Sequence, residues 1–342
     1  MSRHWQGEVR TILAGIAEEE DEREEGEREE DVCHRDTMLL HFKMSKHNLG
    51  LSIHVIYIMF AAHQILGGGF HLTNQDVNMT MFGKSLQSKV GDATKSYMAM
   101  HQTYEGTYFG FVATLDVYGF EINYSQRIIS SVWIVNRGPN DNLEENAIRI
   151  GWQVFPELYG DSHTHFFTYW TRDSYRTTGC YNMRCPGFQL TLGSKITPGD
   201  VISPVSDVDG ARQKITIKEK STGDWWIYYG FNSAPTVVGY FPANLFTNLS
   251  EKATSILFGG SVLAVDGAST PPMGSGLLPS ILSDKAASIE DILLVDEDGK
   301  IAPFDVKTIK DETSDLCYAM TPIFGESTSR CLYGGPGGCV VG

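Results

Sequence analysis

Short runs of alternating apolar and polar residues recur along this chain from residue 107 onward, separated by turn-forming residues. The first run, over residues 109–117, has an apolar side chain at every second position. A period of two buries one face of a β-strand and leaves the other mixed, and no later segment keeps a helical period over a useful length. Many short strands between turns are typical of an all-β sandwich or barrel.

Eight further segments repeat this pattern and are expected to be strands. Ser221 to Asp224 is predicted to form a hairpin turn between two of them, and residues 242–250 a short helix or loop that begins at a proline. Residues 266–281, rich in Gly, Ser and Pro, are expected to form a long surface loop. The eight expected strands are 130–135, 147–154, 165–171, 188–192, 213–219, 225–229, 237–240 and 255–263.

The charge of the chain is concentrated near its N-terminus. Of a net charge of −15, residues 18–31 carry −9, from eleven acidic residues and two arginines, and the rest of the chain carries −6. No basic stripe is present to neutralise phosphates, which argues against nucleic acid as a partner. Residues 1–43 are therefore predicted to be a disordered acidic tail or a gene-model leader.

An apolar stretch of 14 residues, 49–62, follows Lys46. It is shorter than the roughly 20 residues of a spanning helix and fits the apolar part of a signal peptide. We expect residues 44–69 to direct secretion, residues 70–94 to be a linker and residues 95–342 to form one domain. A signal anchor over residues 49–66 is the alternative, and it is the one way in which a membrane would be contacted.

Five of the six cysteines lie in the C-terminal half at short spacings, which favours disulfides and an oxidising compartment. A zinc site needs two paired spacings, and Cys180 with Cys185 has no second pair nearby, so neither a metal nor another cofactor is expected. Glycosylation sequons begin at Asn78, Asn123 and Asn248. These features together predict a secreted glycoprotein.

Eight motifs follow one another in the body of the chain: GWQVFPELYGD (151–161), FFTYWTRDSY (166–175), TGCYNMRCPGF (178–188), GDWWIYYG (223–230), VGYFPANLF (238–246), FGGSV (258–262), MGSG (273–276) and YGGPGG (333–338). In this order they resemble the neprosin domain of plants, over residues 95–342. The resemblance implies an antiparallel β-sandwich of two curved sheets with a concave substrate cleft. It also implies secreted glutamic endopeptidases, in the apoplast or vacuole, that cut after proline in acid.

The resemblance also assigns the cysteines. Cys331 stands where an aromatic residue is usual, so it is either a free thiol or a partner of Cys33. The implied disulfides are Cys180 with Cys185 and Cys317 with Cys339.

The two catalytic glutamates of the family align with Arg149 and Ser261. Hydrolysis by two carboxyl groups needs one ionised group to take a proton from water and one protonated group to donate. A guanidinium stays protonated, and a serine without an activating partner is a poor acid or base. We therefore expect a pseudoenzyme that keeps a cleft for proline-containing peptides.

Two alternatives remain open. Displaced carboxylates, Glu145 or Glu157, could support an active acid prolyl endopeptidase, or the sandwich could bind carbohydrate or cell-wall material. A serine hydrolase is disfavoured because Ser261 lacks the Gly-x-Ser-x-Gly turn, and His163 with His165 gives too few ligands for a metal.

Flat aromatic faces suit the pyrrolidine ring of proline. We expect Trp152, Tyr169 and Trp225 to line the cleft, with packing in the core as the alternative. Adjacent Trp225 and Trp226 must point to opposite faces of a strand. Gln153 has the same parity as Arg149 and is the polar residue expected to face the cleft.

Overall fold

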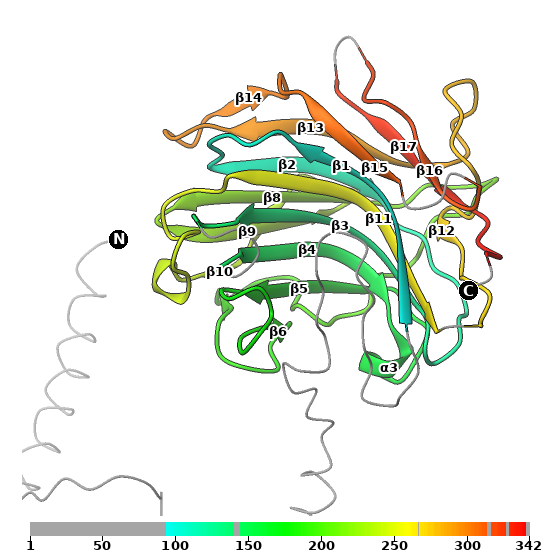
Figure 1. The fold of residues 1–342 in the computed structure, drawn as a ribbon, viewed down its shortest axis with the longest axis horizontal. Helices are drawn as coiled ribbons and strands as arrows, with labels where there is room; N and C mark the ends of the chain where they lie inside the picture. The colour runs from blue at the N-terminus through cyan, green and yellow to red at the C-terminus, as the bar shows by residue number, and fades with distance from the viewer. Residues whose placement is uncertain (1–93, 140–143, 266, 313–315, 326–327, 340–342) are drawn as a thin grey trace, which may run out of the picture. The chain divides into compact units, whose positions relative to one another are not determined.

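A computed structural model describes residues 94–139, 144–265, 267–312, 316–325 and 328–339. In these parts of the chain, two antiparallel sheets account for nearly all of the regular structure (Figure 1). The prediction of an all-β sandwich is therefore confirmed.

The seven-stranded sheet includes residues of the sequence motifs at 151–161, 166–175 and 258–262. All of its strand pairs are antiparallel. Its order is β15 (Thr308–Glu312), β1 (Thr94–Thr103), β11 (Ser255–Val265), β3 (Arg127–Asn136), β4 (Asn146–Val154), β5 (His165–Thr171) and β6 (Cys180–Tyr181).

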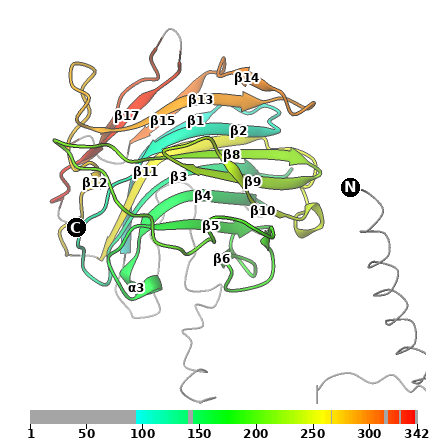
Figure 2. The same ribbon diagram turned by 180° about the vertical axis from the view of Figure 1, so that it is seen from behind.

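The second sheet lies across the core from the first, as the view from behind also shows (Figure 2). Two short strands lie off its main path: β14 (Ile301–Pro303) pairs with β13, and β16 (Ala319–Met320) pairs with β17. The main path runs β12 (Met273–Gly274), β17 (Cys331–Gly335), β13 (Ala287–Val295), β2 (Gly110–Asp116), β8 (Lys214–Thr222), β9 (Asp224–Phe231), β10 (Thr236–Phe241) and β7 (Gln189–Leu190).

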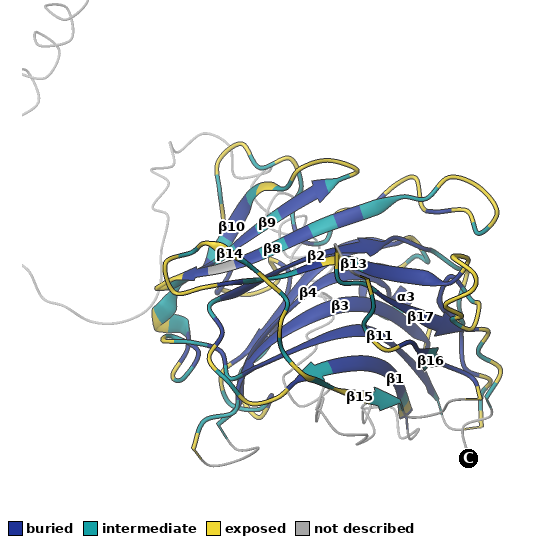
Figure 3. Cartoon of the chain, turned by 90° about the horizontal axis from the view of Figure 1, so that it is seen from above, coloured by how far each residue is buried: buried dark blue, intermediate teal, exposed yellow. Residues whose placement is uncertain are grey.

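Every second residue of a strand points into the core between the sheets. On β4 these are Ile148, Ile150, Trp152 and Val154, all fully buried. Each such side chain gains roughly 1.5–3 kcal/mol when it leaves water. In Figure 3 the buried colour covers most strands of both sheets, whereas β14, β15 and much of the connecting loops are intermediate or exposed.

The seven-stranded sheet has a second buried face, which we call the outer face because it points away from the other sheet. It carries the residues of opposite parity, and Figure 3 shows the strands curving. Its apolar members form a second cluster that includes Met100, Ile129, Trp133, Phe167 and Tyr169. Every residue of β3, β4 and β5 is buried, so both faces of these three strands are buried.

The structure contains all eight expected strands, most of them extended by a few residues, and the expected hairpin. Gly223 alone connects β8 to β9, at φ 93°, a conformation that glycine adopts without steric cost. The expected strand 188–192 is reduced to two residues. The loop predicted over 266–281 is wrong in part, because Met273 is fully buried in β12.

Sequence reasoning missed β1, β13, β15 and β17, and the short strands β6, β12, β14 and β16. In β1 most residues are buried whichever face they occupy, so alternation is weak. In β13 the pairing with β2 is irregular between Glu290 and Leu293, and Asp291 has φ 53°, which breaks the period of two.

Several predictions fall outside the described residues: the acidic tail over 1–43, the signal or anchor segment over 44–69, most of the linker over 70–94, and the roles of Cys33 and Asn78. Within the described part of the chain, no helix is long and apolar enough to cross a bilayer.

Candidate functional site

Arg149 lies in the middle of the outer face. It belongs to β4, where it pairs with Trp133 on β3 and Tyr169 on β5. Ser261 lies two strands away on β11, opposite Ile129. Because β3 separates them and all three strands present these residues to the same side, the Arg149 side chain can cross β3 to reach Ser261.

The Arg149 guanidinium is held by two hydroxyls and an indole ring. Its Nε donates to Ser131 Oγ at 2.7 Å and its Nη2 donates to Ser261 Oγ at 2.9 Å. Its Cζ lies 4.2 Å from the centroid of the Trp133 ring. Burial and, to a smaller extent, the nearby charge of Arg127 lower the pKa of Arg149 to about 9. The group therefore stays positively charged at neutral and acid pH.

Arg127 supplies a second guanidinium on this face. Its Nη1 donates to Tyr181 Oη at 2.7 Å, and its Cζ lies 4.8 Å from the centroid of the Phe155 ring. Tyr181 in turn stacks on Tyr169, with ring centroids 4.2 Å apart. Two cations and a run of stacked aromatic rings thus occupy the part of the face near β4, β5 and β6.

Gln153 lies on the same face as Arg149, as predicted from its parity. Its Nε2 donates to Tyr159 Oη at 2.9 Å, and it is fully buried. Its Oε1 has no hydrogen-bond partner among the described residues. Tyr159 is the last residue of the short helix α3 (Pro156–Tyr159), whose first residue is a proline. The Tyr159 ring stacks on the His165 ring, with centroids 3.7 Å apart.

Two of the aromatic residues predicted to line the cleft lie elsewhere. Trp152 and Trp225 are fully buried in the core between the sheets. Their indole N–H groups donate to backbone carbonyls, of Asp116 at 2.8 Å and of Leu249 at 2.7 Å. The prediction for these two was wrong because Trp152 has the opposite parity to Arg149 and so faces the core, and because Trp225 lies on β9 of the other sheet and also faces the core. Tyr169 does lie on the outer face, beside Arg149.

The candidate substitute carboxylates are separated from Arg149. Glu145 precedes β4 and is four residues from Arg149, which places it about 13 Å away along an extended chain. Burial raises its pKa to about 7, an effect that Arg137 partly opposes. The charge of Glu145 also raises the pKa of Tyr175, which is a phenol and not a second carboxylic acid. Glu157 lies in the first turn of α3 and is half-buried.

The two histidines considered as metal ligands or bases share one carboxylate. His163 Nδ1 lies 3.3 Å and His165 Nε2 3.0 Å from Asp161 Oδ1, and His165 Nδ1 contacts the carbonyl of Gly199. No group of three or more His, Cys, Asp or Glu side chains that could hold a metal occurs among the described residues.

Cys331 is a buried free thiol, and burial raises its pKa. The two expected disulfides, Cys180–Cys185 and Cys317–Cys339, are both present.

The glycosylation candidates differ in their surroundings. The Asn123 side chain is exposed, whereas Asn248 is half-buried and its Nδ2 donates to the carbonyl of Glu144 at 3.2 Å. Glycosylation of Asn123 stays a prediction that the geometry permits, whereas a glycan on Asn248 would have to replace this contact.

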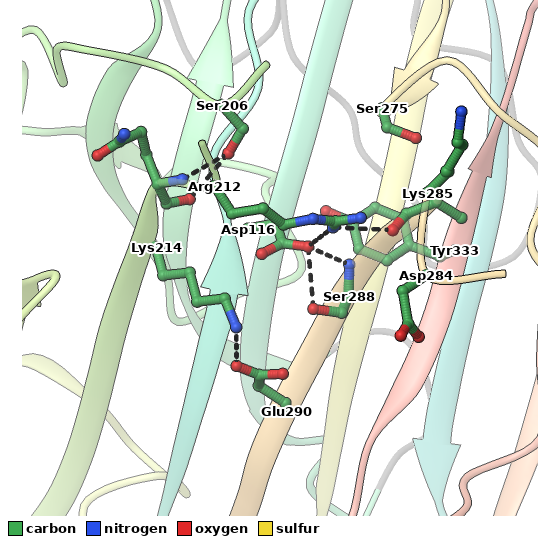
Figure 4. A network of polar contacts seen from close by, with 12 residues as sticks. Asp116, Ser206, Arg212, Lys214, Ser275, Asp284, Lys285, Ser288, Glu290 and Tyr333 are labelled. Carbon is green, nitrogen blue, oxygen red and sulfur yellow. Dashed lines mark hydrogen bonds and ion pairs between the residues drawn. The ribbon is translucent and has the colours of Figure 1, made fainter. Parts of the chain in front are cut away.

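A polar network that sequence reasoning missed lies on β2, β8 and β13 (Figure 4). Asp116 is fully buried, forms an ion pair with Arg212, and accepts hydrogen bonds from the backbone N–H of Ser288 at 2.8 Å and from its Oγ at 2.9 Å. Lys214 and Glu290 form a neighbouring ion pair. Asp116 also accepts the Trp152 bond through its carbonyl, so the network anchors the core rather than the outer face.

This chain was compared with known protein families and with solved structures. The Neprosin family model matches residues 124–336. A solved structure of Scytalido-glutamic peptidase with a peptide-based transition-state analogue is 9% identical, covers 70% of this chain and 98% of that one, and has a TM-score of 0.34. A structure of SCP-B, a member of the Eqolisin family of peptidases, with the tripeptide Ala-Ile-His is also 9% identical, covers 70% and 99%, and has a TM-score of 0.31.

Proposed function

Because this chain belongs to the neprosin family, which is peptidase-like, we propose that it binds peptides on the outer face of its seven-stranded sheet without hydrolysing them. Two disulfides fit a protein that works in an oxidising compartment, and we propose that it is secreted.

The contact between Arg149 and Ser261 carries this proposal. The resemblance assigns these two positions to the family's glutamates, and they are 112 residues apart in sequence. An acid pair that shares one catalytic proton has to be close in space. The 2.9 Å contact between Arg149 Nη2 and Ser261 Oγ supports the view that the two positions form one site.

The groups now at these positions cannot perform the reaction of two carboxyls. Arg149 keeps its proton throughout the acid range, so it cannot act as a base toward water. Ser261 Oγ accepts a hydrogen bond from a cation, which stabilises an oxygen lone pair but provides no base to remove the hydroxyl proton. The pair has lost both the proton donor and the proton acceptor of the mechanism.

Glu145 is the strongest remaining candidate for an acid. With a pKa of about 7 it is protonated at acid pH and could donate a proton. Hydrolysis also needs an ionised partner at short range, and the groups coupled to Glu145 are Arg137 and Tyr175. This favours binding over catalysis.

The test is an assay of the purified full-length chain with an internally quenched peptide that contains proline, between pH 3 and 5. We expect no turnover above the blank. The double variant Arg149→Glu, Ser261→Glu restores two carboxyls and is the variant expected to gain activity, and Lys218→Glu, on the other sheet, is the control for added negative charge.

Turnover by the unaltered chain would contradict the loss of activity. Glu145→Gln and Glu157→Gln would then show whether a displaced carboxylate is responsible. Peptide arrays and glycan arrays probed with the unaltered chain test the binding part, and binding to glycans alone would contradict it.

A further inference from the structure

We propose that a cavity at one edge of the sandwich binds a small carboxylic acid with an aromatic or branched aliphatic body. The cavity lies between the loop of residues 194–203 and the end of the hairpin that β9 and β10 form. None of its lining residues belongs to the apolar cluster of the outer face. Its ligand is therefore independent of the peptide proposed for that face.

The two walls of the cavity come from segments that are anchored to different sheets. The loop 194–203 is fixed to β5, where the Phe166 N–H donates to the Asp200 carbonyl at 2.9 Å. The opposite wall is the end of β9 and the start of β10, which pair through Tyr229 and Thr236. Because both walls are held by backbone pairing, the cavity is formed before any ligand binds.

The size and the apolar walls of the cavity suit a small organic molecule. Its volume is about 420 Å³, and cavities that bind small molecules usually have about 300–1,000 Å³ and mostly apolar walls. Ile202 and Val238 belong to the core, so the ligand would meet apolar surface there. The principal apolar side chains that line the cavity are Ile196, Ile202, Tyr229, Phe231 and Val238. An aromatic ring or a branched chain would gain affinity by burial against them.

Tyr229 is the polar group that points to a ligand with an oxygen acceptor. Its side chain is 8% exposed, and its ring packs on Phe166 with the centroids 4.8 Å apart. Burial raises the pKa of Tyr229, and its hydroxyl makes no hydrogen bond to any residue that the structure describes. Buried polar groups are nearly always hydrogen-bonded in native proteins. A carbonyl or carboxylate oxygen in the cavity would accept the hydrogen bond that this hydroxyl can donate.

The charges at the rim favour an acid over an amine. Lys195 and Asp200 both line the cavity and both are exposed. Asp200 Oδ2 already accepts a hydrogen bond from the Thr197 N–H at 2.8 Å. The Lys195 ammonium has no ion pair or hydrogen bond with a described residue. A ligand carboxylate would therefore gain a cation without displacing an existing partner.

The experiment measures binding of three small probes to the full-length chain by fluorine NMR titration at pH 6. The first, para-fluorophenylacetate, has the ring and the carboxylate. The second, para-fluorophenylacetamide, is its neutral match and keeps the carbonyl. The third, para-fluorophenethylamine, has the same ring and a positive charge.

We expect the acid to bind about threefold tighter than the amide, since an exposed ion pair contributes little, and the amine to bind weakest. Tyr229→Phe should weaken binding of both the acid and the amide about tenfold, through the lost hydrogen bond, without lowering Tm. Lys195→Gln should remove the preference for the acid and leave the affinity of the amide unchanged.

Two matched variants on the solvent-facing side of the same sheet are the controls. Tyr228→Phe removes a hydroxyl from the residue next to Tyr229, which points to the opposite face of β9. Lys218→Gln removes a positive charge from β8. Neither variant should change the affinity for any probe.

The absence of measurable binding of the acid and the amide to the unaltered chain would overturn the proposal. An affinity that Tyr229→Phe leaves unchanged, or that Tyr228→Phe reduces equally, would overturn it as well. Equal affinity for the acid and the amide, or tightest binding of the amine, would overturn the choice of a carboxylic acid. If Tyr229→Phe does not fold, Val201→Trp at an exposed rim position should block the cavity and abolish binding, and unchanged affinity in that variant would contradict the site.

Discussion

Glu219 is an acid placed where its ionisation should destabilise the fold. It lies on β8 with the parity of Ile215 and Ile217, and its side chain points into the core between the sheets. It is 1% exposed, and neither carboxyl oxygen has a hydrogen-bond partner in the described part of the chain. Burial raises its pKa well above the usual range, and no charged group contributes to this shift.

The sign and size of the effect follow from proton linkage. In the unfolded chain Glu219 ionises near pH 4.5, whereas in the fold it keeps its proton. The fold therefore binds one more proton, and stability is highest below pH 4.5 and falls as the pH rises. The fall is about 1.4 kcal/mol per pH unit while the folded group stays protonated, or about 3 kcal/mol between pH 4.5 and 7. For a domain of this size, this lowers Tm by about 6–12 °C.

The assay compares Tm at pH 4.5 and 7 for the unaltered chain and for Glu219→Gln. The amide is neutral at both pH values, so the variant should lose this part of the pH dependence and gain stability at pH 7. Glu219→Leu, which also removes the unpartnered polar atoms, should be more stable still. Glu121→Gln, at an exposed position, is the control and should keep the pH dependence of the unaltered chain.

Glu145 also has a raised pKa and adds to the loss of stability over the same pH range. The contribution of Glu219 is therefore the difference in the pH dependence of Tm between the unaltered chain and Glu219→Gln. If Glu219→Gln falls in Tm between pH 4.5 and 7 as much as the unaltered chain does, Glu219 is not a buried neutral acid and the reasoning is refuted.

Three further predictions concern the core and the free thiol. Asp116→Ala should cost about 3–5 kcal/mol in urea unfolding, because it leaves Arg212 without its buried partner, and a loss below about 1 kcal/mol would contradict this. Trp152→Phe should lower stability by about 1 kcal/mol through the lost bond to Asp116 and leave peptide affinity unchanged, whereas a weaker peptide complex would place Trp152 in the site after all. Cys331 should resist a thiol reagent such as DTNB in the native protein and react on unfolding, and rapid reaction of the folded chain would show that the thiol is accessible.

Local pattern predicted nine of the strands, including β3, β4 and β5, whose two faces are both buried, and missed the others. Strands such as β8 and β9 alternate along their length, so the sequence contained their signal. Strand β13 gave no usable signal because a bulge shifts its register, whereas for β1 the burial pattern alone does not separate it from the strands that were predicted. Glu219 could have been noticed, since it continues the parity of Ile215 and Ile217 onto the apolar face.

At the site, too, some features could be predicted from the sequence and others depend on the order of the strands. Parity placed Gln153 with Arg149 and should have excluded Trp152, because adjacent residues of a strand face opposite sides. No local rule relates Arg149 to Ser261, or Arg127 to Tyr181. These contacts depend on the order β11-β3-β4-β5-β6 across the sheet.

The sequence by itself determined that this chain forms β-strands, which motifs it shares with the neprosin domain, and which side chains now stand at the positions of two glutamates. The tertiary structure decided which face of each strand is the core and which distant residues meet. Alternation is set by the geometry of a single strand, whereas strand order and the burial of a face depend on contacts between separate strands, and some of these, such as β3 and β11, are more than a hundred residues apart.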